Sequence, residues 1–125
     1  MINGTHLLLY SKDPEADRAF LRDVLGFHSV DAGKGWLIFA LPPAEIAVHP
    51  SEEHAAPNTD EGVAGASLYL MCGDLRSTMQ SLEAKNASFG AIEEARWGTV
   101  TTLALPSGAK LGLYQPKHLT AVESR

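Results

Sequence analysis

Apolar and polar positions alternate in blocks along the chain, and these blocks predict alternating strands and helices. Residues 5–11 are rich in large apolar side chains and end at a polar stop, which predicts a strand. Asp13 followed by Pro14 has the pattern of an N-cap with proline at the first helical position. The apolar residues that follow recur at helical spacing, and Gly26 is typical of a glycine that ends a helix.

The rest of the first half predicts strands, and the second half repeats the whole order. Residues 36–41 and 45–49 are apolar segments joined by a proline-rich turn, and a weaker strand is expected near residues 28–31. The second half predicts a strand at 66–72, a helix at 75–86, and strands near 89–93, 99–105 and 110–115. Each half therefore predicts one β-α-β-β-β unit.

Individual residues of the two halves also correspond. Asp13 and Asp74 stand 61 residues apart, and so do Trp36 and Trp97, which we therefore expect to pack alike. Repetition at a nearly fixed offset indicates that each half is one supersecondary unit. We expect a single domain with a first module at 2–50, a polar linker at 51–65, a second module at 66–117 and a polar tail at 118–125.

Composition narrows the function classes. The chain has 125 residues, 45% of them apolar, and a net charge of −5, which fits one globular domain and disfavours disorder. The absence of a basic cluster argues against nucleic acid, and the short apolar runs argue against a membrane span. The N-terminus lacks the pattern of a secretory signal, and the single cysteine, Cys72, cannot form an internal disulfide. We therefore expect a cytoplasmic protein.

The chain resembles the vicinal oxygen chelate superfamily, also called the glyoxalase/bleomycin resistance protein/dioxygenase group. The resemblance rests on the repeated β-α-β-β-β order, on FLRDVLGF at 20–27, and on LPSG at 105–108 followed by LGLYQP at 111–116. It covers residues 2–117 and implies an α+β fold, in which two tandem βαβββ modules form curled, mainly antiparallel half-barrel sheets with the helices outside. It also implies a homodimer. The alternative fold is a ferredoxin-like sandwich, which needs only β-α-β in each half.

The resemblance implies a divalent metal between the two units, bound from their first and last strands. The four corresponding positions here are His6, Ala47, Ser67 and Gly112. Of these, only His6 carries a side chain suited to iron, zinc, nickel or manganese. Glu45 and His49 share a strand face with Ala47, and either could join His6, but they are roughly 13 Å apart along an extended strand. We therefore expect no cofactor, with a metal at His6 and either Glu45 or His49 as the alternative.

Strand parity places aromatic and small side chains together. His6 and Tyr10 share one strand face, as do Ser67 and Tyr69 and also Gly112 and Tyr114. A hollow with aromatic walls suits a flat organic ligand, although the tyrosines could equally be ordinary core residues. The expected ligand-binding residues are His6, Tyr10, Ala47, Ser67, Tyr69, Gly112 and Tyr114.

Three functions fit these observations. The favoured one is binding of a small organic molecule in a cup-shaped cavity without the usual metal. The second is a divalent-metal-dependent lyase, isomerase or extradiol-type dioxygenase that uses His6. The third is a metal-free enzyme in which Glu45, His49 or Tyr114 transfers protons.

Overall fold

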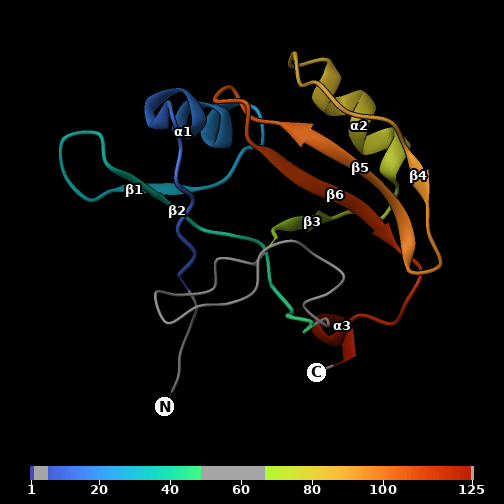
Figure 1. The fold of residues 1–125 in the computed structure, drawn as a ribbon. Coiled ribbons are helices and arrows are strands. Elements are labelled where there is room, and N and C mark those ends of the chain that lie inside the picture. The colour runs from blue at the N-terminus through green and yellow to red at the C-terminus, as the bar shows by residue number, and fades with distance from the viewer. Residues whose placement is uncertain (2–5, 49–66, 125) are drawn as a thin grey trace.

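The computed structural model describes residue 1, residues 6–48 and residues 67–124. Its elements are α1 (Pro14–Asp23), β1 (Ser29–Asp31), β2 (Leu37–Phe39), β3 (Tyr69–Met71), α2 (Leu75–Glu83), β4 (Glu93–Glu94), β5 (Gly98–Ala104), β6 (Lys110–Pro116) and α3 (Ala121–Ser124). Figure 1 shows two open sheets with a helix beside each. The predicted α+β class with open, mainly antiparallel sheets is confirmed.

The two main helices begin at equivalent capping residues. A side-chain oxygen of Asp13 accepts a hydrogen bond from the backbone N–H of Ala16 at 3.2 Å. Asp74 accepts from the backbone N–H of Ser77 at 3.0 Å in the same way. Each cap satisfies a backbone donor that has no partner inside its helix and contributes about 1 kcal/mol. The cap predicted at Asp13 is therefore confirmed, and Asp74, the corresponding residue of the repeat, caps the second helix.

The strands of the described residues form two separate sheets. β1 and β2 pair antiparallel, with Val30 opposite Ile38. The second sheet has the order β3-β6-β5-β4, with β5 and β6 antiparallel along their whole length and β3 parallel to β6. The parallel pairing places Tyr69 opposite Gly112, and the antiparallel pairing places Tyr114 opposite Val100.

One face of the second sheet forms the core. Leu103 and Leu111 are paired across β5 and β6, and both are buried, as is Leu75 at the start of α2. α2 packs against this face of the sheet (Figure 1). Side chains alternate along a strand, so the neighbouring positions point to the side of the sheet opposite α2. We call that side the open face; it carries Tyr69, Val100, Thr102, Gly112 and Tyr114.

A buried carboxylate joins the two halves. Asp17 of α1 is 7% exposed, and one of its oxygens accepts a hydrogen bond from the backbone N–H of Ser107 at 3.0 Å. Its other oxygen accepts from the hydroxyls of Ser107 at 2.8 Å and Ser11 at 2.7 Å. Three donors compensate the loss of water around the charge. Asp17 therefore ties α1 to the turn between β5 and β6 (Figure 1).

Two predicted strands are absent from the part of the chain that the structure describes. Residues 6–11 and 45–48, the described parts of the strands expected at 5–11 and 45–49, form no strand in the structure. An apolar segment becomes a strand only when its backbone groups pair with a neighbouring strand, and local sequence does not specify that neighbour. The apolar side chains of these two segments are exposed to solvent, with Tyr10 and Ile46 each 90% exposed.

Other element boundaries differ by a few residues. The strand expected at 66–72 is reduced to β3, and the helix expected at 75–86 ends at Glu83. The strand expected near 89–93 is represented by a single bridge from Phe89 to Leu103 and by β4. The expected polar tail contains the short helix α3. The expected linker at 51–65 lies outside the described residues.

Candidate ligand-binding site

Three aromatic rings gather on the open face. Tyr69 comes from β3, Tyr114 from β6, and Trp97 from the turn before β5. The ring of Trp97 lies 5.3 Å from that of Tyr114 and 6.1 Å from that of Tyr69, and the two tyrosine rings are 5.7 Å apart. Each pair is close to perpendicular, which is a favourable arrangement for aromatic rings. We call Tyr69, Trp97 and Tyr114 the aromatic cluster.

A glycine makes room for this cluster. A Cβ atom at position 112 would lie 2.0 Å from Cδ1 of Tyr69 and 2.7 Å from its Cγ. Such contacts are far inside van der Waals distance and involve the base of the ring as well as its edge. Gly112 is therefore required for the ring of Tyr69 to lie across β6.

Polar groups border the cluster at Tyr114. The hydroxyl of Tyr114 lies 3.3 Å from Nε2 of His118, within hydrogen-bond distance. Burial raises the pKa of the Tyr114 hydroxyl, and the negative charge of Glu45 and the neighbouring Tyr69 raise it further. Glu45 is held in place by the backbone N–H of Ala121, which donates to its Oε1 at 2.7 Å. Tyr114 therefore stays protonated at neutral pH and can donate a hydrogen bond.

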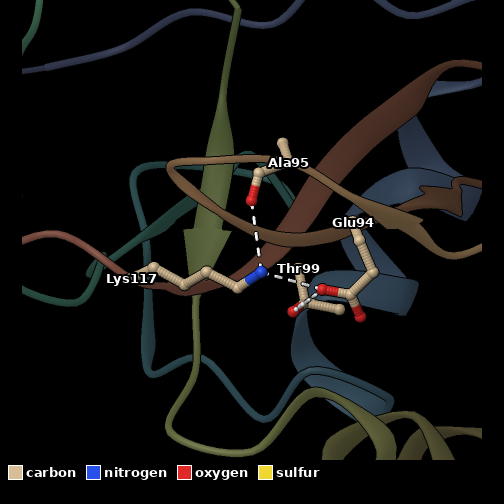
Figure 2. A network of polar contacts seen from close by, with 4 residues as sticks. All are labelled: Glu94, Ala95, Thr99 and Lys117. Carbon is tan, nitrogen blue, oxygen red and sulfur yellow. Dashed lines mark hydrogen bonds and ion pairs between the residues drawn. The ribbon is translucent and has the colours of Figure 1, made fainter.

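A polar network fixes the turn that carries Trp97. Nζ of Lys117 donates to Oε2 of Glu94 at 2.9 Å and to the carbonyl of Ala95 at 3.2 Å (Figure 2). The hydroxyl of Thr99 donates to the same Glu94 oxygen at 2.9 Å. The backbone N–H of Lys117 also donates to the carbonyl of Trp97 at 2.8 Å. The end of β6 and the β4–β5 turn are therefore joined next to the aromatic cluster.

Sequence reasoning missed this network. The hydrogen bond from Lys117, supported by that from Thr99, lowers the pKa of the Glu94 carboxyl. Lys117 and Glu94 are 23 residues apart and belong to no motif. The sequence shows only that Glu94 and Lys117 stand on either side of the strands predicted near 99–105 and 110–115.

The two tryptophans pack differently, which corrects the expectation from the repeat. The guanidinium carbon of Arg18 lies 4.6 Å from the ring centre of Trp36. Trp97, the corresponding residue of the second half, joins two tyrosines instead. The repeat fixes where a tryptophan stands in the chain, whereas its contacts depend on the side chains that surround it.

The structure brings together only some of the predicted site residues. Tyr69, Gly112 and Tyr114 meet on the open face, and Glu45 lies near Tyr114. His6, Tyr10, Ala47 and Ser67 are exposed, and within the described ranges no hydrogen bond or ring contact joins them to the cluster. His49 lies outside the described residues.

The residues do not fit the metal that the resemblance implies. Ala47 and Gly112 have no donor atom, and the space beside Gly112 is filled by the ring of Tyr69. In the part of the chain that the structure describes, no three His, Cys, Asp or Glu side chains come close enough to hold a metal ion. We therefore assign no chemical step to a metal at these positions.

Two surface hollows lie away from the cluster. One, of about 470 Å³, runs along α2 and is lined by residues such as Arg76, Met79 and Ile92. The other, of about 280 Å³, lies beside α1 and β2 and includes Arg18 and Leu37. Neither of these two hollows contains a residue of the aromatic cluster.

Comparison with known proteins places the chain in a family. The family model described as the Glyoxalase/Bleomycin resistance protein/Dioxygenase superfamily matches residues 5–111. No curated protein matches the chain.

None of the described helices is long and apolar enough to cross a membrane.

Several solved structures are similar in fold. TnmS3, an antibiotic binding protein from Streptomyces sp. CB03234, has 19% identity and a TM-score of 0.59, with 94% of this chain and 100% of that chain covered. A lactoylglutathione lyase from Agrobacterium tumefaciens has 16% identity and a TM-score of 0.57, with 90% and 92% covered. A superfamily member from Sphaerobacter thermophilus DSM 20745 has 19% identity and a TM-score of 0.56, with 91% and 98% covered. With the family match over most of its length, this chain belongs to the glyoxalase/bleomycin resistance protein/dioxygenase superfamily.

Proposed function

We propose that this protein binds a small organic molecule on the open face of its second sheet, at the aromatic cluster, without a metal. The observation that carries this proposal is the exposure of the cluster: Tyr69 is 42% and Trp97 43% exposed, although their rings pack against each other. Exposed aromatic surface gathered at one place marks a binding site, because a ligand can remove it from water.

The cluster has the features of a small-molecule site. Its rings offer flat apolar surface to a ligand, while the hydroxyl of Tyr114 and the ring of His118 offer polar groups at its border. Glu45 adds a carboxylate nearby. A few polar groups beside an apolar surface orient a ligand, and this is the usual composition of such sites.

The residues at the four positions where the superfamily resemblance implies metal ligands favour a binding protein over a metal enzyme. A lyase or dioxygenase of the superfamily type needs a metal with open positions for two substrate oxygens. Here two of the four corresponding positions, Ala47 and Gly112, carry no donor. The similarity to an antibiotic binding protein supports the same proposal, while the similarity to a lactoylglutathione lyase keeps the enzymatic alternative open.

A second copy of the chain is also part of the proposal. The first module leaves large apolar side chains open, including Leu9, Tyr10, Ile46 and Val48. Large apolar side chains left exposed are unfavourable in water, and their burial against a second copy would remove them from it. A homodimer that covers them could give residues 6–11 and 45–48, which form no strand in the described structure, strand partners. Sedimentation equilibrium at micromolar concentration should give the dimer mass, and Leu9→Glu should shift it towards the monomer.

A fluorescence titration tests the binding site itself. The chain has two tryptophans, so in a Trp36→Phe background the signal comes from Trp97 alone. A set of planar aromatic compounds should include members that quench this signal with saturation. Tyr69→Ala should weaken the binding at least tenfold, and Val30→Ala, which alters an exposed side chain of β1 outside the cluster, should leave it unchanged. Equal effects of the two substitutions would contradict the proposal.

A further inference from the structure

We propose that the ligand of the aromatic cluster is an organic cation, an alkylated or protonated amine whose charge lies between the aromatic rings and the carboxylate of Glu45. This inference rests on the proposed function and names the chemical class of its ligand.

The rings provide the first part of the argument. The face of an indole or phenol ring carries negative potential and attracts a cation within about 6 Å of its centre. The chain already makes such a contact internally, because Arg18 places its guanidinium 4.6 Å from the ring centre of Trp36. Among the described residues, no arginine or lysine lies over the ring of Trp97 as Arg18 lies over Trp36. The ring of Trp97 contacts Tyr69 and Tyr114 instead.

The charges around the cluster provide the second part. Glu45 lies close enough to Tyr114 for its negative charge to raise the pKa of that hydroxyl. Glu45 accepts one hydrogen bond at Oε1, from the backbone of Ala121, which fixes the carboxylate without supplying a compensating charge. The pairing of Glu93 with Val100 places a second carboxylate on the open face, because paired residues share a face.

The nearby basic groups do not cancel these charges. The ammonium group of Lys117 is bound to Glu94 and to the carbonyl of Ala95 (Figure 2). Glu94 pairs with Thr99, which is buried on the α2 side of the sheet, so this ion pair belongs to the opposite face. Arg96 is exposed in the turn, and His118 is the titratable ring that meets Tyr114. Lys110 also lies on the open face of β6, but it stands four residues before Tyr114, roughly 13 Å along the strand. The open face around Tyr114 therefore complements a positive ligand.

Three probes of similar shape but different charge separate the effect of charge on binding from the effect of shape. Choline carries a trimethylammonium group, 3,3-dimethylbutan-1-ol replaces its nitrogen by carbon, and 3,3-dimethylbutanoate carries a negative charge. Each is titrated at pH 8 into the Trp36→Phe variant, with Trp97 fluorescence as the readout. We expect choline to bind about threefold to thirtyfold more tightly than the neutral alcohol, and the anion to bind more weakly than both.

Glu45→Gln tests the role of the carboxylate. Glutamine keeps an oxygen that can accept from Ala121, so the fold is retained while the charge is removed. The substitution should weaken choline binding about fivefold and leave binding of the alcohol unchanged. Glu83→Gln, on the exposed side of α2, is the matched control and should change neither.

The outcomes distinguish this inference from the proposed function. Equal binding of choline and its neutral isostere, or preference for the anion through Arg96, would overturn the cation while the aromatic site remained valid. Choline binding that Glu45→Gln does not weaken would also overturn it. A Trp97 signal that responds to none of the probes or planar compounds, and instead changes with protein concentration, would assign the surface to a second copy and contradict both proposals.

Discussion

The ring of Tyr69 occupies the space that any side chain at position 112 would need. A Cβ there would stand 2.0 Å from Cδ1 of Tyr69, so the aromatic cluster exists only because residue 112 is glycine. The same position is one at which the superfamily resemblance implies a metal ligand. Here the ring of Tyr69 lies where a metal-binding side chain would stand, so the position offers flat apolar surface and no metal ligand.

Gly112→Ala should therefore break the cluster. The added methyl group forces the ring of Tyr69 away from β6, which we expect to destabilise the fold by about 1–3 kcal/mol. Ligand binding at Trp97 should weaken at least tenfold. The control is Gly73→Ala, because a Cβ at position 73 meets nothing within 4 Å. Urea unfolding and the Trp97 titration measure the two effects, and a Gly112→Ala variant with unchanged binding would contradict the role of the cluster.

Asp17 should stabilise the junction between the halves. Asp17→Ala leaves the donors of Ser11 and Ser107 without their carboxylate, and we expect a loss of about 2–3 kcal/mol in the free energy of unfolding. Removal of both partners should cost less than the two single changes together, because the second change removes a donor already left unpaired. A double-mutant cycle with Ser107→Ala measures this coupling, and strictly additive values would refute a direct bond.

Glu94 should position Trp97. Glu94→Gln weakens the bonds from Lys117 and Thr99, so the turn becomes more mobile and ligand affinity falls about twofold to fivefold. The anisotropy of Trp97 fluorescence in the Trp36→Phe background reports the mobility directly. Asp23→Asn, which removes the exposed pair between Asp23 and Arg22 on α1, is the matched control and should leave the anisotropy unchanged.

The ion pair between Glu94 and Lys117 also predicts that the turn carrying Trp97 becomes more mobile at acid pH. Lys117 and Thr99 lower the pKa of Glu94, so this carboxylate contributes stability above its ordinary value of 4.5 and loses that contribution as pH falls through the lowered value. The Trp97 anisotropy of the parent chain should therefore fall in acid below pH 4.5. Glu94→Gln should abolish this change, and a transition that persists in Glu94→Gln would belong to another group.

Tyr114 should titrate later than an ordinary tyrosine. Burial and the charge of Glu45 raise its pKa above 10.0, so the folded state holds this proton more tightly than the unfolded chain. The resulting stability is complete below pH 10 and is lost as pH rises through the raised value. Glu45→Gln should lower the pKa of Tyr114 while it stays above 10.0. Ultraviolet absorbance titration measures this pKa by difference from Tyr114→Phe. If the pKa of Tyr114 is the same in Glu45→Gln as in the parent chain, Glu45 does not act on this hydroxyl.

Local features of the fold could be predicted from the sequence, and distant contacts could not. The caps at Asp13 and Asp74 follow from short motifs, and the parity of Gly112 and Tyr114 follows from the alternation of a strand. The contact between Asp17 and Ser107 joins residues 90 positions apart, and no local pattern specifies it. The strands expected at 5–11 and 45–49 show the same limit, because an apolar pattern gives a periodicity without naming its partner strand.

The candidate site shows this division as well. Tyr69, Gly112 and Tyr114 follow from strand parity together with the superfamily resemblance, and the pairing of β3 with β6 brings them together. Trp97 was recognised only as a repeated residue, since its place beside the tyrosines depends on the turn that Glu94 and Lys117 hold (Figure 2). His6 was chosen from the resemblance, and its exposed side chain has no contact with the cluster within the described ranges.

The most direct test of the central claim is a titration of the Trp36→Phe variant with its best-binding small organic ligand, in buffer that contains a strong chelator. The account predicts saturable quenching of Trp97 with the same dissociation constant after iron, zinc, nickel or manganese is added in excess of the chelator. Binding that appears only after one of these metals is added, and that disappears in His6→Ala, would contradict the account and assign the chain to the metal-dependent enzymes of its superfamily.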